Sequence, residues 1–209
     1  MTDWADETEQ RMLEAALSFA PEMGWGPAMV DRAARRVGLS RAETELLLPN
    51  GAKDLAALLS RRHDRLTLER LSLIDPSTLK IREKIARGVE TRLAVAFEDE
   101  QALRRWMGFL ALPSNLPLSF RLVWESADHL WRWAGDVATD ENHYSKRAIL
   151  SGILISTLAV RLSSGPEAAS AELSARIDNV MAFEKWKAGI KPAKAMSDFA
   201  AAMGKLRYR

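Results

Sequence analysis

The fold is decided by residues 32–51, which read RAARRVGLSRAETELLLPNG. Gly38 is placed to end one short helix. Ser40 is placed to cap the next helix, because Glu43 stands three residues later and completes a capping box. Two short helices joined by so tight a turn are typical of a helix-turn-helix. We therefore predict helices over residues 29–37 and 40–48. Their small shared core is predicted to contain Ala33, Val37, Leu39, Leu46, Leu47 and Leu48.

The rest of the chain also repeats its apolar residues at helical spacing, and strand-like alternation bounded by turn residues is absent. We therefore predict an all-α fold. The sequence SSGP at residues 163–166 is predicted to end the helix before it. Further helices are predicted at residues 7–23, 52–73, 116–134, 140–162 and 168–183, with an apolar stripe at 79–97 and a helix around Trp106.

Residue types exclude several kinds of chemistry. The chain has no cysteine, which removes disulfides, thiol nucleophiles and thiolate metal sites. Its histidines, His63, His129 and His143, form no HxxxH or Glu-x-x-His pair. Glu125 and Asp128 lie close to His129, but a di-iron helix-bundle site needs the Glu-x-x-His motif twice. No serine nucleophile elbow or Gly-rich phosphate loop occurs either. We predict a protein that is not an enzyme and holds no metal or cofactor.

Hydropathy limits where the chain is expected to work. Its first ten residues are acidic and lack the basic start and apolar run of a signal peptide. The longest apolar stretch, residues 148–162, spans 15 residues and contains polar side chains, whereas a bilayer span needs about 20 apolar residues. We expect a cytoplasmic protein that is at most peripheral on the inner membrane.

The final segment, residues 190–209, is predicted to be an amphipathic, membrane-binding helix. Residues 181–209 hold seven basic and two acidic side chains. Adaptable apolar side chains recur there at helical spacing with basic residues beside them, which is typical of a helix on a membrane surface. The apolar side chains are Met196, Phe199, Met203 and Leu206, and the basic ones are Lys194, Lys205 and Arg207. The alternatives are a helix docked permanently on the core, or one that packs between the subunits of a homodimer.

The N-terminal segment resembles the DNA-binding domain of TetR-type regulators, with which it shares an "A…F…G" first helix and an "A…GLS" turn. The resemblance implies a TetR-like fold, with a helix-turn-helix-like segment at residues 1–50 and a helical ligand domain at 51–189. DNA binding is not implied by the residues themselves, because Glu43 and Glu45 accompany Arg41 where phosphates and base edges call for basic side chains. We expect no nucleic-acid partner, and keep a TetR-type regulator with a hydrophobic ligand as the alternative function.

A second resemblance lies in residues 131–150, WRWAGDVATDENHYSKRAIL. They are similar to the most characteristic segment of the Coq-nine family, W-x-x-A-G-D-x-S-T-D-F-N-W-Y-T-K-R. The TetR-like segment and the amphipathic last helix occur in the same order in that family. The resemblance implies a non-enzymatic, lipid-binding accessory protein of ubiquinone biosynthesis. It would bind an isoprenoid quinone precursor at the membrane and present it to the di-iron demethoxyubiquinone hydroxylase.

The same resemblance implies a docking patch for that hydroxylase. Its residues would be Asp136, Asp140, His143, Tyr144 and Arg147. His143 stands where the family has a tryptophan, so the contact should be weaker or differently shaped. The residues themselves leave two alternatives open. Asp140 suits the N-cap of the following helix, and Arg147 suits an ion pair with Asp136 or Asp140.

The lipid itself is expected among the aromatic side chains of the helical domain. We predict a pocket formed by Phe97, Trp106, Phe109, Phe120, Trp124 and Trp131. Aromatic residues at helical spacing are also typical of an ordinary core, and only the resemblance to the Coq-nine family favours a pocket. The helix at residues 116–134 is accordingly predicted to bury Phe120 together with its tryptophans.

Overall fold

The computed structural model describes residues 4–137 and 141–189. No strand occurs within these two ranges, so the all-α class is confirmed. The elements are α1 (Trp4–Met23), α2 (Pro27–Val37), α3 (Arg41–Leu47), α4 (Ala52–Leu71), α5 (Ile81–Ala96), α6 (Glu100–Leu110), α7 (Leu116–Trp133) and α8 (Glu141–Gly189), with short 3-10 turns η1 (Pro76–Thr78), η2 (Phe97–Asp99) and η3 (Pro113–Asn115).

The predicted turn between α2 and α3 is confirmed in detail. Gly38 ends α2 with a φ of 84°, in the left-handed region that glycine adopts freely. The backbone N–H of Ser40 donates to Glu43 Oε2 at 2.8 Å, and the backbone N–H of Glu43 donates to Ser40 Oγ at 3.3 Å, which makes the capping box. Leu48 is buried below this turn. The expectation that Leu46 shares the small core is wrong, because its side chain points to solvent and α3 buries no residue.

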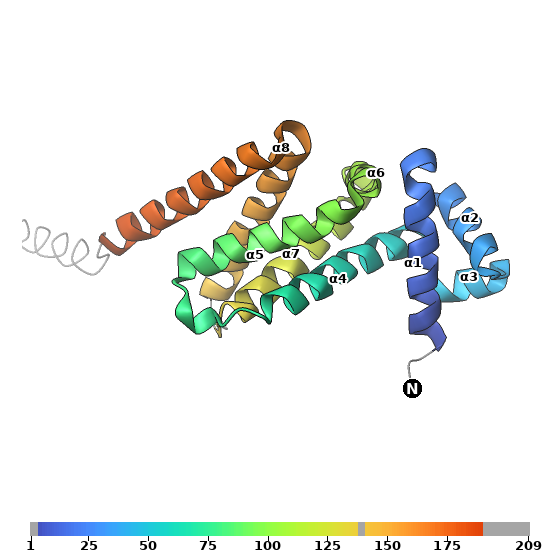
Figure 1. Cartoon of the computed structure of the whole chain (residues 1–209), viewed down its shortest axis with the longest axis horizontal. Coiled ribbons are helices and arrows are strands. Elements are labelled where there is room, and N and C mark those ends of the chain that lie inside the picture. The colour runs from blue at the N-terminus through green and yellow to red at the C-terminus, as the bar shows by residue number, and fades with distance from the viewer. Residues whose placement is uncertain (1–3, 138–140, 190–209) are drawn as a thin grey trace, which may run out of the picture.

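One apolar core joins the N-terminal helices to the rest of the chain. In Figure 1, α1, α2 and α3 form one end of the molecule, and α4 runs from them into a bundle with α5 and α7. The core beneath α1 contains Met12 and Leu13, Leu55 and Leu59 of α4, and Trp106 of α6. It therefore crosses residue 50, the predicted domain boundary, so that α1 and α2 pack directly on the helices that follow.

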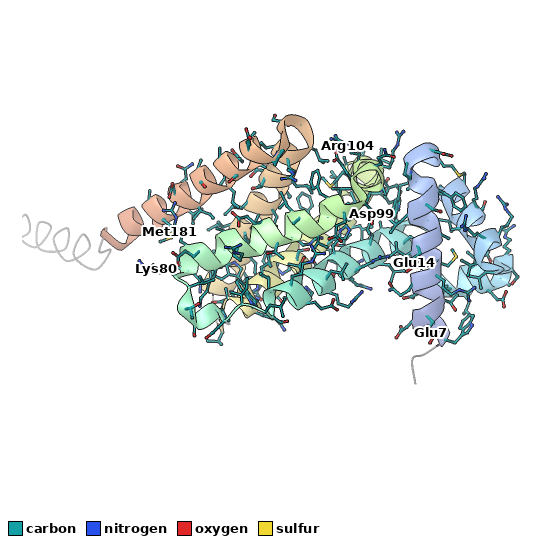
Figure 2. All side chains as sticks on the ribbon, viewed as in Figure 1. Glu7, Glu14, Lys80, Asp99, Arg104 and Met181 are labelled. Carbon is teal, nitrogen blue, oxygen red and sulfur yellow. The ribbon has the colours of Figure 1, made fainter. Side chains whose placement is uncertain are left out.

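The last helix bends back on itself. Gly165 has a φ of 87° and a ψ of −176°, and Pro166 follows it, so α8 breaks at the SSGP sequence as predicted. The half before the break packs against α7, and the half after it runs back along α5 (Figure 1). Arg82 Nη1 of α5 lies 2.6 Å from Asp178 Oδ1 of the returning half. Figure 2 shows Met181 of this half beside the start of α5.

One described segment, His143–Ala182, is long and apolar enough to cross a membrane by its length and composition. It contains the break at Gly165. Leu150, Ile153 and Leu154 in its first half are buried in the core shared with α5 and α7. Packing inside the bundle therefore accounts for part of its apolar character.

Candidate functional site

The corner between α7 and α8 is shaped by the end of α7. Gly135 has a φ of 90°. Its N–H donates to Arg132 O at 3.0 Å, and the N–H of Asp136 donates to Trp131 O at 2.9 Å. This pair of bonds, with a glycine in the left-handed region, is a Schellman helix end. It turns the chain so that the Asp136 carboxylate points back toward α8.

Charged side chains from both helices meet at this corner. Arg147 Nε of α8 lies 2.6 Å from Asp128 Oδ1 of α7, and its Nη1 lies 3.1 Å from Asp136 Oδ2. Each carboxylate has a second partner, since Lys146 Nζ lies 2.6 Å from Asp136 Oδ1 and Arg132 Nε lies 2.8 Å from Asp128 Oδ2. We call these five residues the corner ion cluster.

The centre of the corner ion cluster is withdrawn from solvent, whereas Arg132 and Lys146 close it on the exposed side. The Arg147 side chain is 2% exposed and that of Asp136 is 6% exposed. Arg147 Nη1 also donates to His143 O at 3.1 Å, which fixes the first turn of α8. The ion pair between Arg147 and Asp136 is thus the alternative that the sequence left open. Because the side chains of Arg147 and Asp136 are both buried, they can only position neighbouring surface residues and cannot contact a partner themselves. Asp140, the other candidate partner of Arg147, lies outside the described residues.

An aromatic surface lies above the corner. Tyr144 is 64% exposed and Phe120 is 63% exposed. The ring centroid of half-buried Trp124 lies 6.2 Å from that of Tyr144, whose ring is 5.2 Å from that of His143. Phe120 and Trp124 are one turn apart on α7, so they share a face of that helix. We call Phe120, Trp124, His143 and Tyr144 the aromatic face. The prediction that α7 buries Phe120 is wrong, because α7 buries Leu122, Ser126, Ala127 and Leu130 instead.

A cavity lies behind α7, where residues of α4, α5, α6, α7 and α8 meet. Its volume is about 70 Å³, well below the roughly 300–1,000 Å³ of ordinary ligand pockets. Ile155, which is partly exposed, lies on its wall, so the cavity reaches the surface beside α8. The apolar walls include Leu93, Leu103, Leu122, Val123, Leu154 and Leu158.

The predicted pocket aromatics do not gather around this cavity. Trp106 lines it, and Trp131 lines a second cavity of about 60 Å³ between α5 and α8. Phe97 lies under the Arg161 guanidinium at 4.8 Å. Phe109 lines a groove between α2 and the start of α4, and Trp124 and Phe120 lie on the aromatic face. The leucines of α6 and α8 that line the cavity were not predicted from the sequence, because nothing in the sequence distinguishes a cavity-lining leucine from an ordinary core leucine.

A buried polar cluster touches one end of the first cavity. Asp64 Oδ1 of α4 accepts from Arg92 Nε of α5 and from Ser126 Oγ of α7, each at 2.7 Å. His129 Nδ1 lies 3.7 Å from Asp64 Oδ2. Burial alone would raise the pKa of Asp64, but His129, Arg92 and Ser126 more than offset it, so that pKa is lowered. The Asp64 carboxylate in turn raises the pKa of His129.

No group of three or more metal-ligating side chains occurs among the residues that the structure describes. His63 is buried against Trp106, with ring centroids 6.2 Å apart. Burial, together with the Arg92 charge, holds the pKa of His63 well below its usual value. The predicted membrane-binding side chains, from Lys194 to Arg207, lie outside the described residues.

Comparison with known proteins identifies the family. The COQ9 family model matches residues 116–184, which comprise α7 and most of α8. The chain is 32% identical over 169 residues to "Ubiquinone biosynthesis protein COQ9, mitochondrial" of Bos taurus, covering 78% of this chain and 53% of that protein. The protein of that name in Homo sapiens is 31% identical with the same coverage. The chain belongs to the COQ9 family.

The COQ9 match includes every residue of the corner ion cluster and of the aromatic face. The resemblance to this family inferred from residues 131–150 is therefore confirmed. A more distant relative, "Ubiquinone biosynthesis protein coq9, mitochondrial" of Schizosaccharomyces pombe, is 29% identical over 147 residues, 68% of this chain and 56% of that protein. The chain spans about half the length of the curated COQ9 relatives it matches.

Proposed function

We propose that this chain is a non-enzymatic accessory protein of ubiquinone biosynthesis. It binds an isoprenoid quinone precursor at a membrane surface and presents it to the di-iron demethoxyubiquinone hydroxylase. The names of its COQ9 relatives support the pathway. The function also needs a surface for the enzyme, an apolar site for the lipid and a contact with the membrane.

The observation that carries the proposal is the aromatic face on its rigid support. Tyr144 and Phe120 offer large apolar side chains to solvent, and such residues supply much of the binding energy of protein interfaces. The buried ion pairs of Arg147 hold the first turn of α8 against α7, so these side chains need little ordering on binding. The hydroxylase is proposed to dock here, with Asp136 and Arg147 acting as positioning residues.

The docking proposal is tested by measuring hydroxylase affinity for two variants, Tyr144→Ala and Phe120→Ala. Each truncation is expected to weaken binding at least tenfold, since an interface hot spot contributes about 2 kcal/mol or more. Leu73→Ala is the matched control, because Leu73 is also strongly exposed but lies in the turn after α4. Unchanged affinity in both Tyr144→Ala and Phe120→Ala would place the docking surface elsewhere.

Membrane association is tested by flotation with vesicles that contain anionic lipid. The chain that ends at Gly189 lacks the apolar and basic side chains of residues 190–209. We expect the intact chain to float with the vesicles and the shortened chain to stay in solution. If both stay in solution at low salt, the last segment is not a membrane anchor.

The alternative function, a TetR-type regulator, finds little support in α3. Arg41 Nε lies 2.7 Å from Glu45 Oε1, and Glu43 is held in the capping box, so α3 offers no unpaired basic side chain. A regulator would bind duplex DNA with an affinity that falls steeply with salt. We expect no sequence-specific shift of duplex DNA by the intact chain.

A further inference from the structure

The cavity behind α7 has walls that are apolar apart from Ser119, and polar side chains gather at one end of it. The polar end is formed by Arg92 of α5, Ser60 of α4 and Ser126 of α7. Arg92 is only 8% exposed, so a full positive charge is held inside the bundle. We call these three residues the polar end of the cavity.

Arg92 uses only part of its hydrogen-bonding capacity. Its Nε donates to Asp64 Oδ1 at 2.7 Å, whereas its Nη1 and Nη2 donate to no residue within the described ranges. The guanidinium has five N–H donors and needs acceptors for them when it is buried. Because Arg92 lines the cavity, its remaining donors are available to a molecule inside it. The Ser60 hydroxyl, on the same wall, has no hydrogen-bond partner among the described residues either.

The charge at the polar end is already balanced. Asp64 neutralises Arg92, and its other oxygen faces His129 at 3.7 Å. An anionic ligand would therefore add an uncompensated negative charge in a buried place, which is unfavourable. A neutral hydrogen-bond acceptor can use the spare donors without that penalty.

We propose that the polar end of the cavity recognises a neutral oxygen acceptor, such as a quinone carbonyl, at the end of an apolar chain. This inference rests on the proposed lipid-binding function and specifies which group of the ligand the polar end of the cavity hydrogen-bonds to. The acceptor accepts from Arg92 and Ser60, while the chain runs along the leucine walls toward the opening at Ile155. A cavity of about 70 Å³ holds only the first atoms of such a ligand. Binding therefore requires α6 and α8 to part, and the flexible Met107 on the wall can adapt to this.

The test compares three probes that share a ten-carbon chain. Equilibrium dialysis of the intact chain is carried out with 2-decyl-1,4-benzoquinone, with decylbenzene and with decanoate. We expect the quinone to bind at least tenfold more tightly than decylbenzene, a difference of about 1.4 kcal/mol, and more tightly than decanoate. Equal binding of quinone and decylbenzene, or tightest binding of decanoate, would overturn the inference.

Two variants locate the effect at the polar end of the cavity. Arg92→Lys keeps the charge opposite Asp64 but lacks the planar fork that supplies donors in two directions. Ser60→Ala removes the second donor and leaves the ion pair untouched. Both are expected to weaken quinone binding, Arg92→Lys about tenfold, without changing decylbenzene binding. Quinone affinity that is unchanged in both variants would refute the role of this end.

A third variant separates the lipid site of the proposed function from the recognition of an oxygen acceptor at the polar end of the cavity. Ala96→Phe fills the cavity and should abolish binding of quinone and decylbenzene alike, whereas Ala94→Phe, on the exposed side of α5, should not. If the wild-type chain binds neither probe, or if Ala96→Phe binds as well as wild type, the lipid site of the proposed function is wrong as well. If both probes bind equally in the cavity, the lipid site stands and only the recognition of the acceptor fails.

Discussion

Replacing Arg147 with methionine should destabilise the whole corner between α7 and α8. Methionine keeps the apolar stem but leaves two carboxylates without their buried partner. Removing one member of a buried ion pair typically costs about 3–5 kcal/mol. Arg132 and Lys146 still contact Asp128 and Asp136 from the solvent side. The loss in free energy of unfolding should therefore lie near the lower end of that range, at about 3 kcal/mol. For a chain of this size, about 3 kcal/mol corresponds to a fall in Tm of roughly 6–12 °C.

The assay is thermal and urea unfolding followed by circular dichroism, with Arg82→Met as the matched control. Arg82 also pairs with a carboxylate, that of Asp178, but their side chains are 51% and 55% exposed. Such exposed pairs contribute about 0–1 kcal/mol. Arg147→Lys should fall between the two, since one ammonium cannot bridge both carboxylates as the guanidinium does. If Arg147→Met and Arg82→Met differ by less than about 1 kcal/mol, the corner ion cluster does not stabilise this part of the fold.

Three further predictions concern other parts of the chain. Burial lowers the pKa of His63, so below about pH 6.5 the unfolded chain binds a proton that the folded chain does not. The contribution of His63 to the free energy of unfolding should therefore fall between pH 7.5 and 5.5. Because the raised pKa of His129 acts in the opposite direction, the effect is measured as the difference between the wild type and His63→Phe in urea unfolding at both values. Gly165→Ala should lower the free energy of unfolding by about 1–3 kcal/mol in thermal unfolding, because the φ and ψ of Gly165 suit only glycine. Gly152→Ala is the control, since Gly152 lies within a regular, exposed turn of α8 and its replacement should be neutral or stabilising. Ser40→Ala should cost about 1 kcal/mol by removing the cap of α3, and an unchanged Tm would contradict that role.

Local signals made most of the fold predictable. The Ser40–Glu43 capping box and the glycine before it depend only on neighbouring residues, and the same is true of the break at Gly165 and Pro166. The error at Phe120 arose because α7 has apolar residues on two faces. Its buried face includes Ser126, which looks polar in the sequence but hydrogen-bonds to Asp64.

The candidate site was only partly predictable, because local sequence patterns do not specify contacts between distant helices. Arg147 and Asp136 are 11 residues apart and flank one turn, so their pairing could be proposed as an alternative. Asp64 and Arg92 are 28 residues apart on different helices, and nothing in the spacing of two ordinary charged residues pairs them. The cavity that Arg92 lines depends on how five helices meet, which no local pattern specifies.

The tryptophan side chains give the molecule a set of internal reporters. Four indole N–H groups donate to a backbone carbonyl on another element: Trp25 to Ala52 O, Trp106 to Ala56 O, Trp131 to Lys146 O and Trp133 to Leu71 O. The four bonds sample the N-terminal helices, α6, the α7–α8 corner and the end of α4 separately. In deuterated solvent each indole proton should therefore exchange at the rate at which its own contact opens. Local opening on binding a lipid or a partner could then be followed at single contacts without introducing a label.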